Sequence, residues 1–173
     1  MADKAAKALR LTAMDQDGLR VLSACVQDAL TRLAEMTYQR KERRFVLTAN
    51  RYMWEQDRDA AADKREGSLH YRIRTGLHFE GVLGVQSQGL MQEDRNGWVS
   101  LLAVEVDGGD DNVGDGAGNL FLTLVFAAGA RIRLEVECID CVLTDMDEPW
   151  TTQARPDHEL DAQAEGLAAD PIP

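Results

Sequence analysis

Residues that usually carry chemistry are scarce in this chain. Its 173 residues include three cysteines and three histidines. A structural zinc site needs four ligands, and three irregularly spaced cysteines do not make a disulfide framework. No GxSxG motif, HExxH motif or GKS/T phosphate loop is present. The residues therefore predict no metal, no cofactor and no catalytic group, and they leave open whether the chain is an enzyme.

Long apolar runs and a basic surplus are also missing. No run approaches the ~18 apolar residues of a membrane span, and Met1 to Leu11 contains lysines without the apolar core of a signal peptide. We therefore expect a cytoplasmic protein with reduced thiols. A net charge of −11 argues against binding to nucleic acid or to an anionic membrane surface.

The charge is unevenly distributed along the chain. Residues 1–74 contain 15 Lys/Arg and 11 Asp/Glu, a net charge of +4, whereas residues 75–173 contain 4 and 19, a net charge of −15. Two interpretations stay open. Either the acidic part keeps the protein soluble, or unlike halves of two protomers attract each other, as in a homo-oligomer.

What the sequence does contain is a clear β-hairpin between Leu120 and Leu143. Apolar residues alternate along the first arm, and residues 127–130 supply a turn of alanine and glycine. The second arm alternates apolar with charged residues, so one of its faces is apolar and the other is charged. This segment predicts a sheet-based domain.

Other segments complete the expected fold. Apolar residues at helical spacing predict a helix from about Asp17 to Leu30, with an N-cap oxygen from Asp15 or Asp17. A second hairpin is predicted over 33–39 and 44–54, around a charged turn at 40–43. Further strands are expected over 9–14, 69–75, 77–88 and 98–106, with loops over 55–68 and 107–119.

These elements predict an α+β domain with one N-terminal helix packed on a coiled antiparallel sheet of about seven strands. A pleckstrin-homology-like or other partly open barrel is the first architecture, and two small α+β halves with a shared core are the second. We expect a single domain over 9–150, followed by an acidic disordered tail over 151–173.

Two motifs are weaker than they look. Cys138 and Cys141 form a CxxC, which is at most half a zinc site, and the motif continues a strand instead of opening a helix as a redox pair would. We therefore predict two structural cysteines in or near the core. The Gly/Asp run over 108–116 lacks the alternating carboxylates and final Glu of an EF-hand, so a polar loop explains it.

Basic side chains supply the candidate binding site. Arg51, Arg74 and His78 lie on predicted strands and would line a pocket for an anionic ligand if they converge, since arginine binds carboxylate and phosphate bidentately. His78 alternates with Glu80 on one face, a possible base and its orienting carboxylate. The alternative is a solvated basic hairpin.

Four segments carry a resemblance to a known family: KERRF (41–45), NRYMW (50–54), RTGLHFEGVL (74–83) and IRLEVECI (132–139). On these the chain resembles a small family of alphaproteobacterial proteins classified as a domain of unknown function. The resemblance implies a bacterial cytoplasmic protein and transfers no catalytic residue.

The sequence favours a non-enzymatic binding or assembly module that acts as a homo-oligomer or with a protein partner. The alternative is a small-molecule enzyme or ligand-binding protein that uses Arg51, Arg74 and His78 for an anionic ligand.

Overall fold

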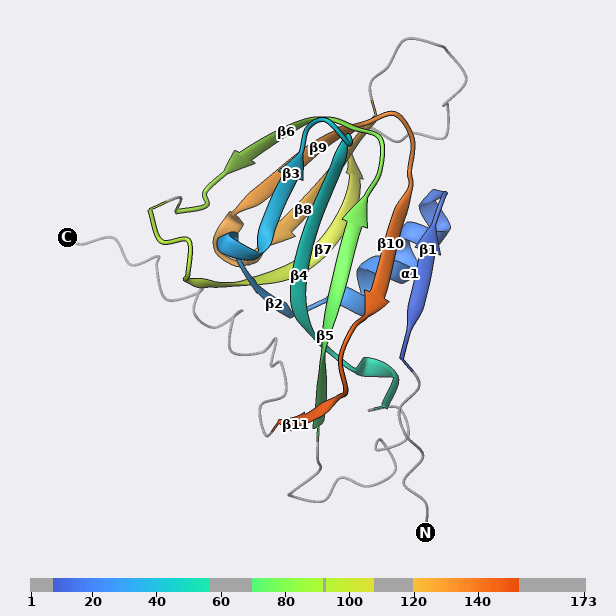
Figure 1. Cartoon of the computed structure of the whole chain (residues 1–173), viewed down its shortest axis with the longest axis vertical. Helices are drawn as coiled ribbons and strands as arrows, with labels where there is room; N and C mark the ends of the chain where they lie inside the picture. Colours follow the sequence, from blue (N-terminus) through green and yellow to red (C-terminus); the bar gives the residue numbers. More distant parts are fainter. Residues whose placement is uncertain (1–7, 57–69, 92, 108–119, 153–173) are drawn as a thin grey trace, which may run out of the picture.

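The computed structural model describes residues 8–56, 70–91, 93–107 and 120–152. Three expected segments fall wholly or mostly outside these residues: the loops over 55–68 and 107–119 and the tail over 151–173. Figure 1 shows the described elements: β1 (Arg10–Ala13), α1 (Gln16–Val26), β2 (Ala29–Arg32), η1 (Leu33–Glu35), β3 (Met36–Gln39), β4 (Arg44–Tyr52), β5 (His70–Phe79), β6 (Val82–Gln88), β7 (Trp98–Asp107), β8 (Leu120–Phe126), η2 (Ala127–Gly129), β9 (Arg131–Val136), β10 (Cys141–Asp145) and β11 (Trp150–Thr152).

Helix α1 begins where the sequence predicts. The side chain of Asp15 accepts a hydrogen bond from the Gly18 N–H at 2.7 Å, which satisfies one of the donors that a helix start leaves unpaired. Three apolar side chains one turn apart are buried on its inner face: Leu19, Leu22 and Val26.

The helix ends four residues before the predicted Leu30. Asp28 adopts a left-handed φ of 59°, and the chain then continues as β2. Strand β2 pairs with both β4 and β7, so hydrogen bonding to the sheet outweighs the helical spacing of Ala29 and Leu30.

The described strands join one antiparallel sheet in the order β1-β10-β5-β4-β2-β7-β8-β9-β6, with β11 beside β5 and β3 beside β4. The predicted α+β class with an antiparallel sheet is confirmed, but the expected seven strands are wrong, because the described residues form eleven. The strands that the sequence does not reveal are short: β2 has four residues, β11 has three, and β10, which has five, is merged in the prediction with the second arm of the hairpin. So few residues cannot establish an alternation.

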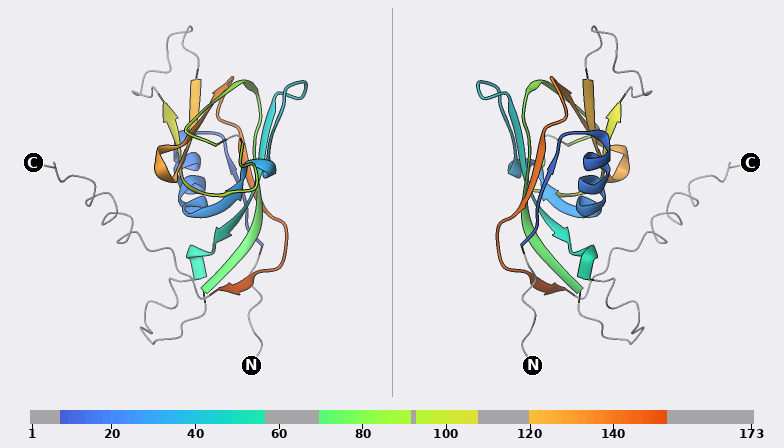
Figure 2. Two further views of the ribbon diagram at one scale, coloured as in Figure 1. Left: turned by 90° about the vertical axis from the view of Figure 1, so that its left-hand side faces the viewer. Right: turned by 90° about the vertical axis from the view of Figure 1, so that its right-hand side faces the viewer.

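The sheet bends into two layers and stays open between β1 and β6. Strands β10, β5 and β4 form the front layer in Figure 1, and β7, β8 and β9 lie behind them. In Figure 2, α1 lies on the inner side of β4 and β5, level with the second layer. The apolar core fills the space between the layers, with contributions from α1 and from strands of both.

Both predicted hairpins are confirmed in outline. Strands β8 and β9 pair around η2, where Ala128 and Gly129 take left-handed φ angles of 59° and 75°. Strands β3 and β4 pair around the charged turn, although Leu33–Glu35 form a 3-10 turn instead of continuing the first arm. The expected break at Gly76 is absent: β5 is continuous, and the chain turns at Gly81, where φ is +66°.

Among the described helices, none has the length and apolar character needed to cross a bilayer.

Candidate functional site

Arg51 is the centre of a buried ion cluster on the inner face of β4. Its side chain and that of Asp145 on β10 are both 0% exposed. Nε and Nη2 of Arg51 donate to the two carboxylate oxygens of Asp145, each at 2.8 Å. Nη1 and Nη2 also donate to Glu55 at 3.1 and 2.7 Å, and Nη1 donates to the Tyr52 carbonyl at 3.5 Å. All five N–H groups of the guanidinium are thereby used.

This inner cluster connects distant parts of the chain. Asp145 accepts a hydrogen bond from the Leu9 N–H at 2.8 Å and returns one from its own N–H to the Leu9 carbonyl at 2.9 Å. Burial alone would lower the pKa of Arg51, but its hydrogen bonds to Asp145 and Glu55 outweigh burial and raise that pKa above its usual value. The cluster therefore holds β1, β4 and β10 together and leaves no donor for a ligand.

Arg74 lies on the opposite, outer face of the same strands. It sits on β5 directly across from Asn50, so its side chain points away from Arg51. Its Nη2 donates to Glu35 Oε1 at 3.0 Å and to the Thr48 hydroxyl at 3.1 Å, and 34% of the side chain is exposed. The structure thus separates Arg51 from Arg74.

Two arginines share the single carboxylate of Glu35. Arg32 Nη2 donates to the same Oε1 atom at 2.8 Å as Arg74 does at 3.0 Å. The Glu35 side chain is only 11% exposed, which raises its pKa, but the hydrogen bonds and charges of Arg32 and Arg74 outweigh burial and lower the pKa below its usual value. Oε2 of Glu35 and Nε of Arg32 are buried without a hydrogen-bond partner among the described residues.

His78 shares the outer face with Arg74 but lies four residues further along β5, about 13 Å away at the rise of a strand. Its Nε2 is 3.7 Å from Glu80, whose carboxylate also binds Arg44 Nε at 2.6 Å. The predicted neighbourhood of His78 and Glu80 is therefore present. The structure brings Arg74 and His78 onto one face without placing them in contact.

The outer face carries further arginines and large apolar side chains. Arg72 stacks over the Tyr52 ring, with 5.8 Å from Cζ to the ring centroid, and Arg32 stacks over Trp98 at 4.8 Å. Trp98 is 54% exposed, and Met146 and Trp150 are also exposed beside β5. We call this set the basic face; its charged and titratable members are Arg10, Arg32, Arg44, Arg72, Arg74 and His78, with Glu35 and Glu80 paired among them.

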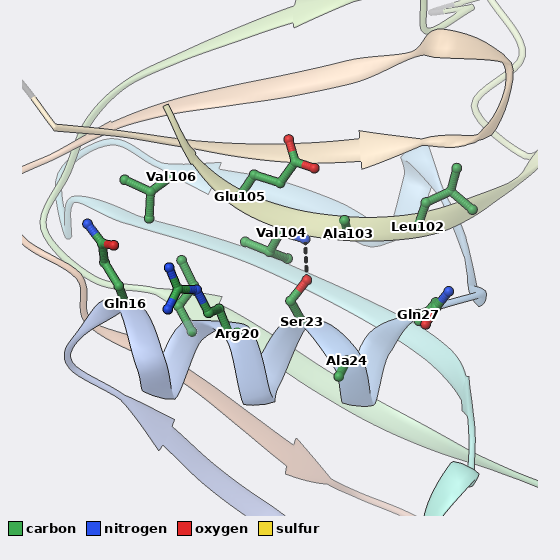
Figure 3. Close-up of a pocket in the computed structure, with 11 residues that line it drawn as sticks. Gln16, Arg20, Ser23, Ala24, Gln27, Leu102, Ala103, Val104, Glu105 and Val106 are labelled. Atoms are coloured by element: carbon green, nitrogen blue, oxygen red, sulfur yellow. Dashed lines mark hydrogen bonds between the residues drawn. The ribbon is translucent and has the colours of Figure 1, made fainter. Parts of the chain in front are cut away.

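A groove of about 540 Å³ separates α1 from β7 (Figure 3). Beyond Leu101, β7 pairs with β8 alone within the described residues, so its other edge faces the helix. The hydroxyl of Ser23 accepts the Val104 N–H at 2.8 Å on the floor of the groove. The helix thus takes the place of a neighbouring strand and covers an edge that would otherwise be open to pairing.

The cysteines do not form a reactive or metal-binding site in the described residues. Val136 ends β9 and Cys141 begins β10, so the CxxC spans a connection; the expectation that it continues a strand is wrong. Cys141 is a core residue, and its burial, with a smaller effect of Asp140, raises its pKa to about 12. Cys138 is exposed, contrary to the prediction of a second core cysteine. No three His, Cys, Asp or Glu side chains in the described part of the chain are arranged to hold a metal ion.

Several residues of the basic face were not found from the sequence. Arg32 lies between the predicted helix and the hairpin arm predicted from residue 33, and the sequence indicates no binding role for Glu35, Trp98 or Met146. The sequence carries no clear signal for Arg32, because Ala29 and Leu30 also fit a helical spacing and a four-residue strand cannot establish an alternation. The approach of Glu35 to Arg74 across 39 residues has no local signature.

Comparison with known proteins gives one match. No curated protein and no solved structure matches the chain. The family model "Protein of unknown function (DUF2948)" matches residues 9–158, which include every described strand and the helix. The predicted membership in a domain-of-unknown-function family is confirmed, while the alphaproteobacterial source stays an expectation. The chain therefore belongs to the DUF2948 family of proteins of unknown function.

Proposed function

We propose that this protein is a non-enzymatic binding module that recognises an acidic segment of a partner protein through its basic face. The observation that carries this proposal is the gathering of five arginines and a histidine on one sheet face of a chain whose net charge is −11. Glu35 and Glu80, together with Asp28 beside Arg72, offset this charge only in part. A positively charged face on a negatively charged protein steers acidic partners toward that one surface.

The apolar residues of this face support a protein partner. Trp98, Met146 and Trp150 are exposed around Arg32, Arg72 and Arg74. Tryptophan, methionine and arginine are enriched in the centres of protein interfaces, where aromatic rings and arginine forks supply much of the binding energy. A surface that needed only solubility would not expose these rings.

The arginines also keep unused donors. Within the described part of the chain, Arg74 makes its hydrogen bonds through Nη2, so its Nε and Nη1 remain for a carboxylate of the partner. Glu35 fixes the position of both Arg32 and Arg74 before any partner arrives, which reduces the entropy that binding would otherwise lose.

Nucleic acid is the less favoured polyanion. The overall charge of −11 repels a long phosphate backbone, and the carboxylates of Glu35 and Glu80 lie among the arginines. Cytoplasmic location is part of the proposal, since the three cysteines are free thiols. Self-association through this face is a further outcome that the following experiment separates.

The test is fluorescence anisotropy with a labelled oligoglutamate peptide and, in parallel, a labelled single-stranded RNA. The full chain should bind the peptide more tightly than the RNA, and the double variant Arg32→Glu/Arg74→Glu should lose peptide binding. The matched control, Arg20→Glu/Arg43→Glu, changes the charge equally on α1 and on the turn before β4, outside the basic face, and should bind like the unmodified protein. Light scattering reports whether the free protein is a monomer or a homo-oligomer.

Equal peptide binding by the Arg32/Arg74 variant and by the control would refute the proposal, as would tighter binding of RNA. If circular dichroism shows that the charge reversal unfolds the protein, Arg32→Gln/Arg74→Gln takes its place, because neutral amides introduce no repulsion with Glu35. Trp98→Ala should weaken peptide binding less than the double variant does, because it removes stacking and leaves the charge.

A further inference from the structure

We propose that a pocket on the opposite layer binds a small molecule that carries an oxyanion group, either phosphate or carboxylate. This β6–β9 pocket has a volume of about 340 Å³, in the range of small-molecule sites. Its lining is polar, which suits a hydrophilic ligand, and comprises Gln86, Ser87, Gln88, Asp107, Thr123, Arg131 and Arg133.

Arg133 is held in place for such a ligand. Its Cζ lies 3.8 Å from the centroid of the Phe121 ring, so the guanidinium stacks flat on an aromatic face. Its Nε is 3.3 Å from Asp107 Oδ2, and the same oxygen accepts the Thr123 hydroxyl at 2.6 Å. The ring and the carboxylate together fix both the plane and the direction of the arginine fork.

The two Nη groups of Arg133 are available to bind a ligand. Nε makes the ion pair, and neither Nη group of Arg133 has a partner among the described residues. A planar guanidinium with two free Nη groups matches the geometry of carboxylate and phosphate oxygens. Because Arg133 is already immobilised, binding an oxyanion costs little side-chain entropy.

Arg131 supplies a second positive charge at the same pocket. It lies two residues before Arg133 on β9, so both side chains leave the same face about 7 Å apart. Across the neighbouring strand, Gln88 is opposite Arg131 and Gln86 is opposite Arg133. Two arginines can bracket one oxyanion, while the amides offer donors and acceptors to ligand hydroxyl groups.

The surrounding charges distinguish this pocket from the basic face. Glu105 and Glu135 lie on adjacent rows of the same outer surface, opposite Thr123 and Phe121. Long-range attraction of anions is therefore weak here, and affinity must come from direct contacts with Arg131 and Arg133. Salt should therefore weaken binding here less than it weakens peptide binding at the basic face, which also loses a long-range attraction.

The experiment is an NMR titration of the full chain, labelled at the arginine side chains, with inorganic phosphate and, separately, with citrate. The Arg133 Nε–Hε signal should shift saturably with at least one of them. When NaCl rises from about 0.1 M to about 1 M, the Debye length shortens from about 10 to about 3 Å, and the affinity should fall less than that of the oligoglutamate peptide for the basic face. A response to phosphate alone identifies a phosphorylated ligand, and a response to citrate alone identifies a carboxylate.

Matched variants test whether the guanidinium of Arg133 is responsible for binding the anion. Arg133→Lys keeps the charge but loses the planar stack and the paired Nη groups, so we expect binding at least ~10-fold weaker. Arg20→Lys makes the same change on the exposed face of α1, outside both proposed sites, and should leave the titration unaltered. Phe121→Leu, which removes the ring and keeps both arginines, should also weaken binding and serves if Arg133→Lys fails to fold.

The proposal is overturned if neither anion gives a saturable shift, or if Arg133→Lys and Phe121→Leu both bind as the unmodified protein does. Because the pocket and the basic face share no residue, failure here leaves the proposed recognition of acidic segments untouched.

Discussion

The inner group, Arg51 with its carboxylate partners, and the outer group, Arg32 and Arg74 with Glu35, lie on opposite faces of the sheet and use the arginine charge differently. On the inner face, Arg51 gives all five of its donors to Asp145, Glu55 and a backbone carbonyl. On the outer face, Arg32 and Arg74 share one oxygen of Glu35. A saturated, buried arginine joins elements of the fold, whereas a half-exposed arginine with spare donors is equipped to meet another molecule.

Removing Arg51 from the inner group should have the largest effect on stability. Arg51→Met leaves the buried carboxylate of Asp145 without its partner, which should lower the free energy of unfolding by about 3–5 kcal/mol. Urea denaturation measures the loss. Arg51→Met/Asp145→Leu should recover most of it, because well-packed apolar residues often replace a buried pair without penalty. A single variant as stable as the unmodified protein would contradict the structural role of Arg51.

Removing the shared carboxylate should have an intermediate effect. Glu35→Gln weakens two charge-assisted hydrogen bonds and should cost about 1–3 kcal/mol at neutral pH. The pKa of Glu35 is lowered in the folded protein, so its stabilisation is fully present above its ordinary pKa of 4.5 and is lost as the pH falls through the folded value.

Free energies of unfolding measured at several pH values check the direction of this pH dependence. The difference between the unmodified protein and Glu35→Gln should be constant above about pH 5 and should shrink below pH 4.5, where Glu35 takes up a proton in the unfolded chain before it does so in the folded protein. A difference that grew in acid would contradict the lowered pKa. Glu137→Gln, which removes an exposed carboxylate paired with Arg43, is the control and should change stability much less.

Arg74→Gln should have a small effect on stability and a large one on recognition. An ion pair exposed to this degree contributes at most about 1 kcal/mol. The melting temperature should therefore change little, while anisotropy with the oligoglutamate peptide shows weaker binding. A variant that unfolded as Arg51→Met does would show that the two groups of arginines are both structural.

Thiol labelling should show no difference between Arg74→Gln and the unmodified protein. Cys138 is exposed and should react first with a maleimide, whereas Cys141 should react slowly, because burial raises its pKa to about 12. Arg51→Met should speed the reaction of Cys141 by favouring opened states of the core. Faster labelling in Arg74→Gln would show that the outer group also holds the core closed.

The sequence predicts strands in which apolar residues alternate over six or more positions, and helices in which an N-cap precedes an apolar face. It does not predict the short elements. The β8–β9 hairpin has six or seven residues in each arm, and α1 has a capping Asp15 before its stripe of leucines. Strand β2 has four residues, and two of them, Ala29 and Leu30, continue a helical spacing, so its pairing with β7 decides its conformation. Tertiary contact, and not local preference, selects the strand there.

The sequence predicts that basic side chains on a strand form the candidate site, but it does not predict which side chains come together. Arg74 and His78 were expected on a strand that carries basic residues, and they lie together on one face. Arg51 was grouped with them, although it differs from Arg74 by one register position across β4 and β5, which places it on the other face. Its partner Asp145 lies 94 residues away in the chain, and a single sequence does not reveal such a pair.

The separation of Arg51 from Asp145 also orders events during synthesis. At about 5–20 residues per second, roughly 5–20 s pass between translation of the two residues, which are 94 positions apart. During that interval β4 and β5 can pair, but the guanidinium destined for the core has no buried counter-ion and favours a hydrated state. We therefore expect the nascent chain not to complete its core until β10 has been synthesised. Folding of the domain then becomes a late, nearly all-or-none step.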